Sequence, residues 1–442
     1  MFCNAHRLRL AFTMLCLTST LQLLGCGGAD DITLSREILV HGGAMKPHTI
    51  APAKDRADVY YYAGQSIYGE SAVAVHLPEP GGGATVLWRY DRDPRRARMK
   101  GGVYFAGGSR PTFRGLVPMS DGSVFLCGDG PGDHGKDRPA LLVRLDNAGR
   151  VISEDEVLPP KTTEEGTKLG GGQKVTVIGG FDRCLTWGND VVALGTAHYY
   201  GASVQKYHWV VVANSAGQIV WQKLVRFDMK FWDEFVTVRV TPRSLFFTRL
   251  LNYAGDTSTD IVSMSRTGDL VAHRQLRGFY VAVSSDGEEP LRIVGGDQSR
   301  TKSLITLGED LRETSREDGL ATGSMAASAA YDLDGSALLL FGFERPNDQS
   351  SVRYSSASYV DKQRSVRSRL FAPWRPWQLL LGGLRDYGTV VSARTQRPGE
   401  FIIARNLYKN SVFSFEGLGL ALNFVGAPPS QGDKRRRLSH VW

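Results

Sequence analysis

One short segment gathers the side chains best suited to binding or proton transfer. The stretch AHYYGASVQKYHW, residues 197–209, holds His198, Tyr199, Tyr200 and His208. Aromatic rings and imidazoles on one loop could stack on a sugar or a peptide, and they could also supply an acid and a base. The alternative is that most of them are alternating residues of two strands with one face buried. We treat these four residues as the candidate binding site and expect binding rather than catalysis.

A second polar segment, CGDGPGDHGKD, spans residues 127–137. It holds Asp129, Asp133, His134 and Asp137, and carboxylates grouped in a loop could bind calcium. Their spacing differs from that of an EF-hand loop, and Gly–Asp clusters are also typical of long turns. We therefore expect a turn here and no bound metal.

A third segment, DRDPRRARMKGG, spans residues 91–102 and is rich in cations. It could contact lipopolysaccharide phosphates or an acidic partner, but we predict a solvated loop. The formal net charge is +8, and about +2 remains once two N-terminal arginines and the run KRRR at 434–437 are set aside. The body of the protein is nearly neutral, so we expect no nucleic-acid partner.

The N-terminus has the organisation of an export signal. Basic residues at positions 7 and 9 precede an apolar stretch from Leu10 to Leu24, which is shorter than the roughly 20 residues of a spanning helix. The stretch ends in Leu23-Leu24-Gly25-Cys26.

That ending resembles the lipobox of bacterial lipoproteins, although Leu24 stands where a smaller residue is more usual. The resemblance implies cleavage before Cys26, acylation of its thiol and amino group, and a lipid anchor. Gly27 at the next position favours sorting to the outer membrane. We therefore expect a signal peptide at 1–25, a flexible tether at 26–31, and a location in the bacterial cell envelope.

Two cysteines remain for the folded part. Cys127 and Cys184 could pair in an oxidising envelope, or they could be two buried small hydrophobic residues. The spacing of the cysteines and histidines matches no zinc site.

The elements that must position these residues are short strands. Three runs align as strand, polar turn and strand, with a glycine closing each turn at Gly149, Gly217 and Gly268. A hairpin turn of this kind requires a positive φ, which glycine adopts freely. The three runs are LLVRLDNAGRVI (141–152), WVVVANSAGQIVW (209–221) and DIVSMSRTGDLVA (260–272).

Strand ends recur along the chain at intervals of roughly 50 residues, the period of an all-strand repeat. The markers are Gly64, Gly128, Gly195, Thr248, Gly295, Gly342 and Ala393. We predict one all-β propeller over residues 32–427, with seven blades, although six or eight are possible. The alternative is two β-sandwiches in tandem. Residues 32–40 and 420–426 are predicted to pair in one shared blade.

Two segments interrupt this pattern. Residues 153–175 are predicted to form a long loop, and residues 428–442 a basic disordered tail.

The turn SAGQIVW with Trp221 resembles the repeats of quinoprotein-type propellers and of a related lipoprotein that assists outer-membrane protein assembly. The likeness implies blade architecture. The adjacent cysteine pair of the quinone enzymes is missing, and we expect no cofactor.

Together these observations predict a lipid-anchored envelope propeller that binds a protein, a peptide or a glycan. The alternative is a propeller enzyme acting on an envelope polysaccharide or a similar substrate.

Overall fold

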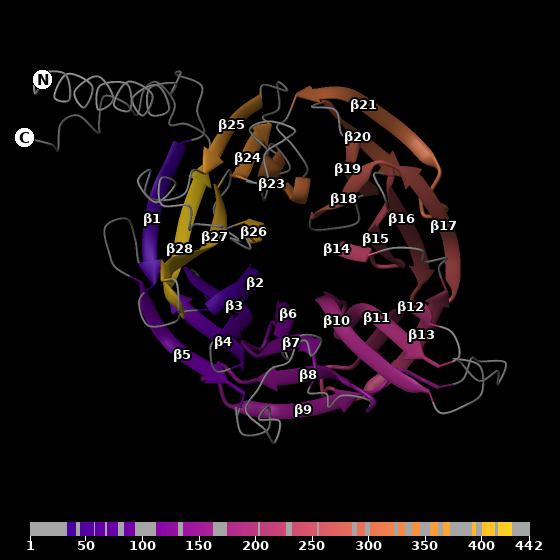
Figure 1. Cartoon of the computed structure of the whole chain (residues 1–442), viewed down its shortest axis with the longest axis horizontal. Coiled ribbons are helices and arrows are strands. Elements are labelled where there is room, and N and C mark those ends of the chain that lie inside the picture. The colour runs from indigo at the N-terminus through magenta and orange to yellow at the C-terminus, as the bar shows by residue number, and fades with distance from the viewer. Residues whose placement is uncertain are drawn as a thin grey trace, which may run out of the picture.

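The structure is a computed structural model in which every described element is a strand. It describes residues 33–40, 45–56, 58–66, 69–77, 84–92, 112–130, 136–161, 175–201, 204–226, 232–253, 256–284, 290–296, 301–321, 326–331, 338–344, 354–360, 366–371, 391–394, 400–411 and 414–426. These ranges form strands β1 to β28 (Figure 1). Within them, no helix has the length and hydrophobicity needed to span a membrane.

Consecutive strands pair antiparallel in groups of four, which we call units 1 to 7. Unit 1 is β2 (Met45–Pro52), β3 (Val59–Ser66), β4 (Gly69–His76) and β5 (Thr85–Asp91). Unit 2 is β6 (Thr112–Pro118), β7 (Val124–Asp129), β8 (Ala140–Leu145) and β9 (Val151–Val157). Unit 3 is β10 (Thr176–Trp187), β11 (Asp190–Tyr200), β12 (Val204–Ala213) and β13 (Ile219–Arg226).

The later units repeat this order. Unit 4 is β14 (Trp232–Val240), β15 (Ser244–Tyr253), β16 (Asp256–Ser265) and β17 (Leu270–Arg277). Unit 5 is β18 (Phe279–Ser284), β19 (Leu291–Gly296), β20 (Thr301–Leu307) and β21 (Glu313–Ala321). Unit 6 is β22 (Ala326–Tyr331), β23 (Leu338–Glu344), β24 (Tyr354–Val360) and β25 (Val366–Phe371). Unit 7 is β26 (Val391–Arg394), β27 (Glu400–Ser411), β28 (Ser414–Gly426) and β1 (Thr33–Val40).

The first strands of the units form a closed inner ring. Each contacts the next in the order β2, β6, β10, β14, β18, β22 and β26, and β26 contacts β2 again. The sheets extend outward from this ring (Figure 1). The single-propeller prediction is therefore confirmed, and the tandem-sandwich alternative is wrong. The grouping in fours is typical of the four-stranded blades of a propeller.

Both ends of the described chain meet in unit 7. Strand β1 pairs antiparallel with β28, from Thr33 opposite Gly426 to Val40 opposite Leu420. Figure 1 shows indigo β1 beside yellow β28 at the outer edge of the unit. The predicted shared unit is confirmed, and it closes the ring with backbone hydrogen bonds.

The three predicted hairpins are present, and side chains hold their turns. In the β8–β9 turn, Asp146 Oδ1 accepts hydrogen bonds from the amides of Ala148 and Arg150, at 2.9 and 2.8 Å. Asn214 plays the same part in the β12–β13 turn. The turn glycines Gly149, Gly217 and Gly268 have φ values of 78°, 89° and 88°.

Two expectations about strand positions need correction. Six of the seven markers lie on the second strand of a unit, but Ala393 lies on β26, the first strand of unit 7. The first and second strands of a unit are both short and largely apolar in sequence, so the recurrence of apolar runs does not tell one from the other. Residues 153–157 continue β9 rather than starting a loop. An outermost strand is exposed over much of its length, and its polar sequence SEDE therefore resembles a loop.

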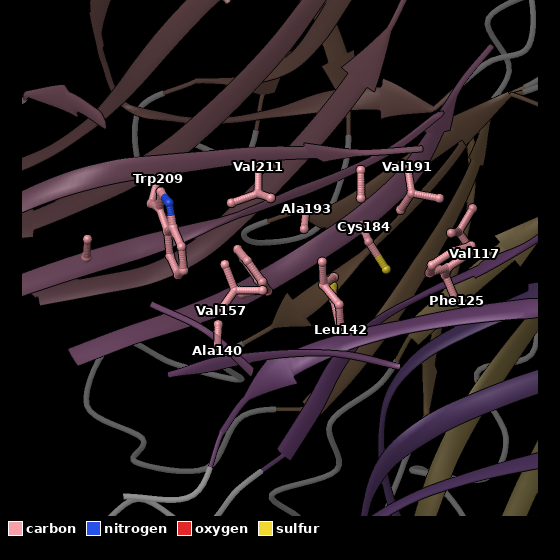
Figure 2. Close-up of a cluster of buried hydrophobic side chains, with 14 of the residues drawn as sticks. Val117, Phe125, Ala140, Leu142, Val157, Cys184, Val191, Ala193, Trp209 and Val211 are labelled. Atoms are coloured by element: carbon pink, nitrogen blue, oxygen red, sulfur yellow. The ribbon is translucent and has the colours of Figure 1, made fainter. Parts of the chain in front are cut away.

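Adjacent units pack face to face through apolar side chains. Figure 2 shows one such layer, in which Phe125 and Leu142 of unit 2 lie near Val191 and Val211 of unit 3. At the outer edge, each turn also contacts the outermost strand of the preceding unit. A Cβ at Gly149 would lie 2.7 Å from the Trp88 ring of β5, and one at Gly268 would lie 3.2 Å from the Trp221 ring of β13.

The two ends of the strands differ in their connections. At the turn face, the first strand of each unit connects to the second, and in units 1 to 6 the third connects to the fourth, as at Gly149, Gly217 and Gly268. At the loop face, the second strand connects to the third, and the fourth connects to the next unit. These two names are used below.

Gly149→Ala should destabilise the protein more than Gly319→Ala. Both glycines have positive φ, at 78° and 85°, but a Cβ at Gly319 meets no atom within 4 Å. Each substitution should cost about 1 kcal/mol for the backbone, and Gly149→Ala about 1–3 kcal/mol more for the Trp88 contact. Chemical denaturation measures both losses. Equal losses would contradict the packing of the turn on Trp88.

Candidate functional site

The three polar segments singled out in the sequence belong to the same end of the propeller. Residues 130–139 connect the second and third strands of unit 2, and residues 201–203 do so in unit 3. Residues 92–111 connect unit 1 to unit 2. All three connections therefore fall on the loop face, although residues 93–111, 131–135 and 202–203 lie outside the described residues.

The alternation of strand β11 divides the four candidate binding residues. Tyr199 faces unit 2, where it is buried, donates a hydrogen bond to the Pro160 carbonyl at 2.6 Å and packs edge-on against Tyr207. Tyr199 is therefore a core residue rather than a binding residue. His198, Tyr200 and, on β12, His208 point to the opposite face of the sheet, toward unit 4.

His198 and Tyr200 lie closest to the loop face. The His198 Nδ1 atom and the Tyr200 hydroxyl are 3.3 Å apart, and the Tyr200 side chain is exposed. Burial, followed by the positive charges of Lys206 and Arg249, lowers the pKa of His198 to about 4. A neutral imidazole and an exposed phenol here can stack and hydrogen-bond without adding charge.

His208 is buried in a hydrogen-bonded set of charged groups between units 3 and 4. Arg249 Nε donates to His208 Nδ1 at 2.9 Å, and His208 Nε2 lies 3.2 Å from Asp260 Oδ2. Because an arginine only donates, His208 must carry its proton on Nε2 and donate it to Asp260. His273 of β17 contacts the other oxygen of Asp260.

The pKa shifts in this set follow from burial and hydrogen bonding. Burial first, and then the Arg249 charge, lowers the pKa of His208 to about 3. Burial alone would raise the pKa of Asp260, but the hydrogen bonds from His208 and His273 lower it to about 2. The same carboxylate raises the pKa of His273. At neutral pH, His208 is a neutral linker between Arg249 and an ionised Asp260.

Ion pairs continue from this set to the innermost strands. Arg249 lies 3.5 Å from Asp182, Asp182 lies 3.4 Å from Arg114, and Arg114 lies 3.1 Å from Asp129. Asp129 in turn lies 3.3 Å from Arg138. We call the groups from Arg249 to Arg138 the ion-pair chain.

Two members of the ion-pair chain reach solvent. The side chains of Arg114 and Asp182 are 41% and 25% exposed. Each stands at a register shift of its innermost strand, between Phe113 and Gly115 on β6 and between Phe181 and Arg183 on β10. A β-bulge of this kind redirects a side chain from its normal alternation. The ion-pair chain thus exposes a cation, Arg114, beside an anion, Asp182.

The two described carboxylates of the 127–137 segment, Asp129 and Asp137, are engaged by protein groups. Asp129 belongs to the ion-pair chain, and Asp137 pairs with Lys161 at 2.6 Å and accepts from the Val177 amide at 2.9 Å. Asp133 and His134 lie outside the described residues. Among the residues that the structure does describe, no group of three or more His, Cys, Asp or Glu side chains is arranged to hold a metal.

Arg92 corrects the prediction of a solvated loop at its own position. Its side chain is buried and pairs with Glu154 at 2.7 Å and Glu156 at 3.0 Å. The carboxylates come from β9 of the next unit, so Arg92 joins two units. The composition of 91–102 could not reveal partners more than 60 residues away in the sequence.

Cys127 and Cys184 belong to the same hydrophobic cluster between units 2 and 3, and Figure 2 shows Cys184 in it. They are buried free thiols on β7 and β10. Burial, followed by the hydrogen bond between the Cys127 thiol and Cys184, raises the pKa of Cys127 well above its ordinary value. Their pairing as a disulfide stays a prediction, and their neighbourhood agrees equally with two buried apolar residues. Cys26 lies outside the described residues.

The sequence analysis missed the residues that organise this site. Arg249 lies within LFFTRLL, Asp260 within STDIVSM, and Asp182 within GGFDRCL. A charged residue inside an apolar strand must find a partner when buried. The sequence therefore indicates that each of these charged residues has a partner, but it does not indicate which residue that is, because several of the partners belong to other units.

Comparisons with known proteins add little to this geometry. No protein-family model matches the chain, and no curated protein sequence does. A subtype N10 neuraminidase-like protein of A/little yellow-shouldered bat/Guatemala/060/2010 is similar in structure, with 10% identity and a TM-score of 0.40 over 90% of this chain and 100% of that one. The WD40 domain of SCAP from fission yeast has 9% identity and a TM-score of 0.35 over 88% of this chain and 98% of that one. A Bacteroides caccae protein of unknown function has 10% identity and a TM-score of 0.39 over 72% of this chain and 94% of that one. At this similarity, we draw no conclusion from them.

His208 should make the protein less stable as the pH falls. Its pKa is about 3 in the folded protein and about 6.5 in the unfolded chain, so the unfolded chain binds a proton that the native protein does not bind. Between about pH 6 and pH 4 this lowers the free energy of unfolding by about 1.4 kcal/mol per pH unit. His208→Gln keeps a donor and an acceptor but does not titrate, and it should remove that slope.

Denaturation of both proteins at several pH values measures the difference. His273 acts with the opposite sign, because its raised pKa gives stability below the unfolded value that is lost as the pH rises. It is present in both proteins, so the difference between them reports His208. Parallel pH profiles would contradict the assignment of His208 as a buried neutral imidazole.

The two core thiols should be inert in the native reduced protein. Burial and the raised pKa of Cys127 keep it protonated, and only the thiolate reacts quickly. Iodoacetamide should therefore modify both cysteines only after denaturation. Rapid modification of the native protein would contradict the described core.

Proposed function

We propose that the protein is a lipid-anchored propeller of the bacterial cell envelope that binds a protein, peptide or glycan at its loop face. The anchor is the acylated Cys26, and the outer membrane is the proposed location. The propeller fold supplies a rigid frame, and binding requires only that polar and aromatic groups converge on one end of it.

The ion-pair chain is the observation that carries this proposal. Arg114 and Asp182 are held in place by partners on three units and remain partly exposed. Groups fixed in this way lose little conformational freedom when a ligand binds, which favours affinity. A fixed donor beside a fixed acceptor suits the hydroxyl and amide groups of glycans and peptides.

The state of the histidines favours binding over catalysis. A general base works best with a pKa near the working pH, whereas His198 and His208 have pKa values of about 4 and 3. Both ring nitrogens of His208 are also engaged within the protein. The enzyme alternative would therefore need other residues for proton transfer.

The proposed anchor is tested by fractionation and intact mass. The full chain and a Cys26→Ser variant are expressed in a two-membrane bacterium. We expect the wild type in the outer-membrane fraction with acyl mass on a chain that begins at Cys26, and the variant without acyl mass. A soluble, unmodified wild type would instead favour a freely secreted protein.

The proposed binding face is tested with the unlipidated Cys26→Ser chain. It is titrated with soluble peptidoglycan fragments, with delipidated outer-membrane oligosaccharide and with an envelope peptide library. Tyr200→Ala and Arg114→Gln should each weaken any saturable binding about tenfold, the effect of losing one good polar or aromatic contact. Leu87→Ser on the turn face is the control. Equal effects of all three substitutions, or no saturable binding, would contradict a loop-face site.

A further inference from the structure

Four successive outermost strands have two consecutive exposed aliphatic residues at the turn face, within their first three positions. The second residue of each pair stands at a register shift, where one extra residue is inserted opposite the neighbouring strand. At such a bulge, two neighbouring side chains can point outward together. The bulge residues are Leu87, Ile152, Val220 and Val271.

These residues form a regular series rather than scattered exposure. The bulge residues and the aliphatic residues before them are 41–57% exposed. Single exposed aliphatic side chains are common on protein surfaces, but these recur at one structural position in units 1 to 4. In unit 5, Glu313 and Thr314 occupy the equivalent place, so the fold itself does not require apolar residues there.

A pocket of mixed lining lies at the same end. It has a volume of about 360 Å³, lies between units 4 and 5, and is lined by apolar residues such as Pro242 and Leu291 together with Arg243 and Glu309. It lies beside the first turn of unit 4 and the last turn of unit 5. The aliphatic pairs of units 1 to 4 are therefore the main exposed apolar feature among the described residues of the turn face.

The start of the described chain lies at this same face. Thr33 pairs with Gly426 at the end of β28, just as Val151 pairs with Leu145 at the end of β8. The proposed lipid anchor at Cys26 is seven residues before Thr33, and even a fully extended segment of that length spans about 25 Å. An anchored protein would thus keep its turn face close to the membrane.

We propose that the turn face lies on the lipid bilayer, with the aliphatic pairs of units 1 to 4 inserted at the headgroup–acyl boundary. This inference rests on the proposed anchoring at Cys26. A bilayer is flat and can meet pairs spread over four units at once, and membrane binding grows with the buried apolar area. The loop face, with Arg114, Asp182 and Tyr200, then points away from the membrane.

Several charges of the turn face are neutralised by partners. Arg150 pairs with Asp146 at 2.8 Å and Arg312 with Asp310 at 3.2 Å. Arg266 pairs with Asp190 at 3.2 Å. We therefore expect these paired arginines to contribute little to lipid contact.

Depth-dependent fluorescence quenching tests the proposal. Val220→Cys and Val204→Cys are introduced separately into the full chain and labelled with bimane. Both valines are 57% exposed and belong to unit 3, but Val220 lies at the turn face and Val204 at the loop face. On vesicles of phosphatidylethanolamine and phosphatidylglycerol carrying nitroxide lipid, the label at 220 should be quenched at least roughly threefold more than that at 204. Equal quenching, or stronger quenching at 204, would overturn the proposal.

A second set of variants separates lipid contact from altered folding. A label at Leu87→Cys should lose about half of its quenching or more when Ile152, Val220 and Val271 are all replaced by serine. Leu158→Ser with Val204→Ser, exposed aliphatic residues of the loop face, is the matched control and should leave the quenching unchanged. Equal effects of the two sets would contradict insertion of the pairs.

Intact mass keeps this test separate from that of the anchor. Quenching at 220 without acyl mass at Cys26 would support the membrane-facing turn face and contradict the lipid anchor. Acyl mass at Cys26 with equal quenching at positions 220 and 204 would support the lipid anchor and contradict the membrane-facing turn face. The absence of both would contradict both proposals.

Discussion

No four-stranded unit of this protein can cover its own two faces. Valines and leucines point to both sides of strands such as β11 and β12, so each unit is stable only between two others. The ring is the arrangement that gives every unit two neighbours. The contacts at the rim follow from it, because the turn of one unit must fit against the outermost strand of the unit before. Trp88 against Gly149 is the tightest example, since the ring occupies the space of a side chain that glycine lacks.

The same constraint places charged groups inside the molecule. Near the turn face, the layer between units 3 and 4 is apolar, with Leu245, Phe247 and Val262 meeting Val210 and Val212. Toward the loop face the same layer contains His208, Arg249 and Asp260. Buried charges are costly unless they are paired, and here each is paired with a group on another strand or another unit. The polar part of the layer therefore fixes how two units are aligned, whereas the apolar part mainly supplies stability.

Much of the architecture could be predicted from the sequence because it is written in local patterns. The glycine at the end of each hairpin turn and the recurring apolar strands lead to the propeller, and the apolar residues at 32–40 and 420–426 lead to the closing strand pair. The site could not be predicted in the same way. Asp260, Arg249 and Asp182 are unremarkable within their own strands, and their meaning comes from partners that ring closure brings together. One feature of the site could have been predicted from the alternation of strand residues. Tyr199 and Tyr200 are consecutive in a strand, so their side chains must face opposite sides of the sheet.

The pairing of β1 with β28 has a consequence for how the protein folds. The first described strand of the chain completes a unit whose other strands are the last to be made. Until then, β1 has no partner and β28 has an open edge, and a long loop must close before the two can meet. During synthesis, β1 would therefore remain unpaired until nearly the whole chain has been made. Such a strand can pair with another molecule, so ring closure is the step at which folding competes with aggregation.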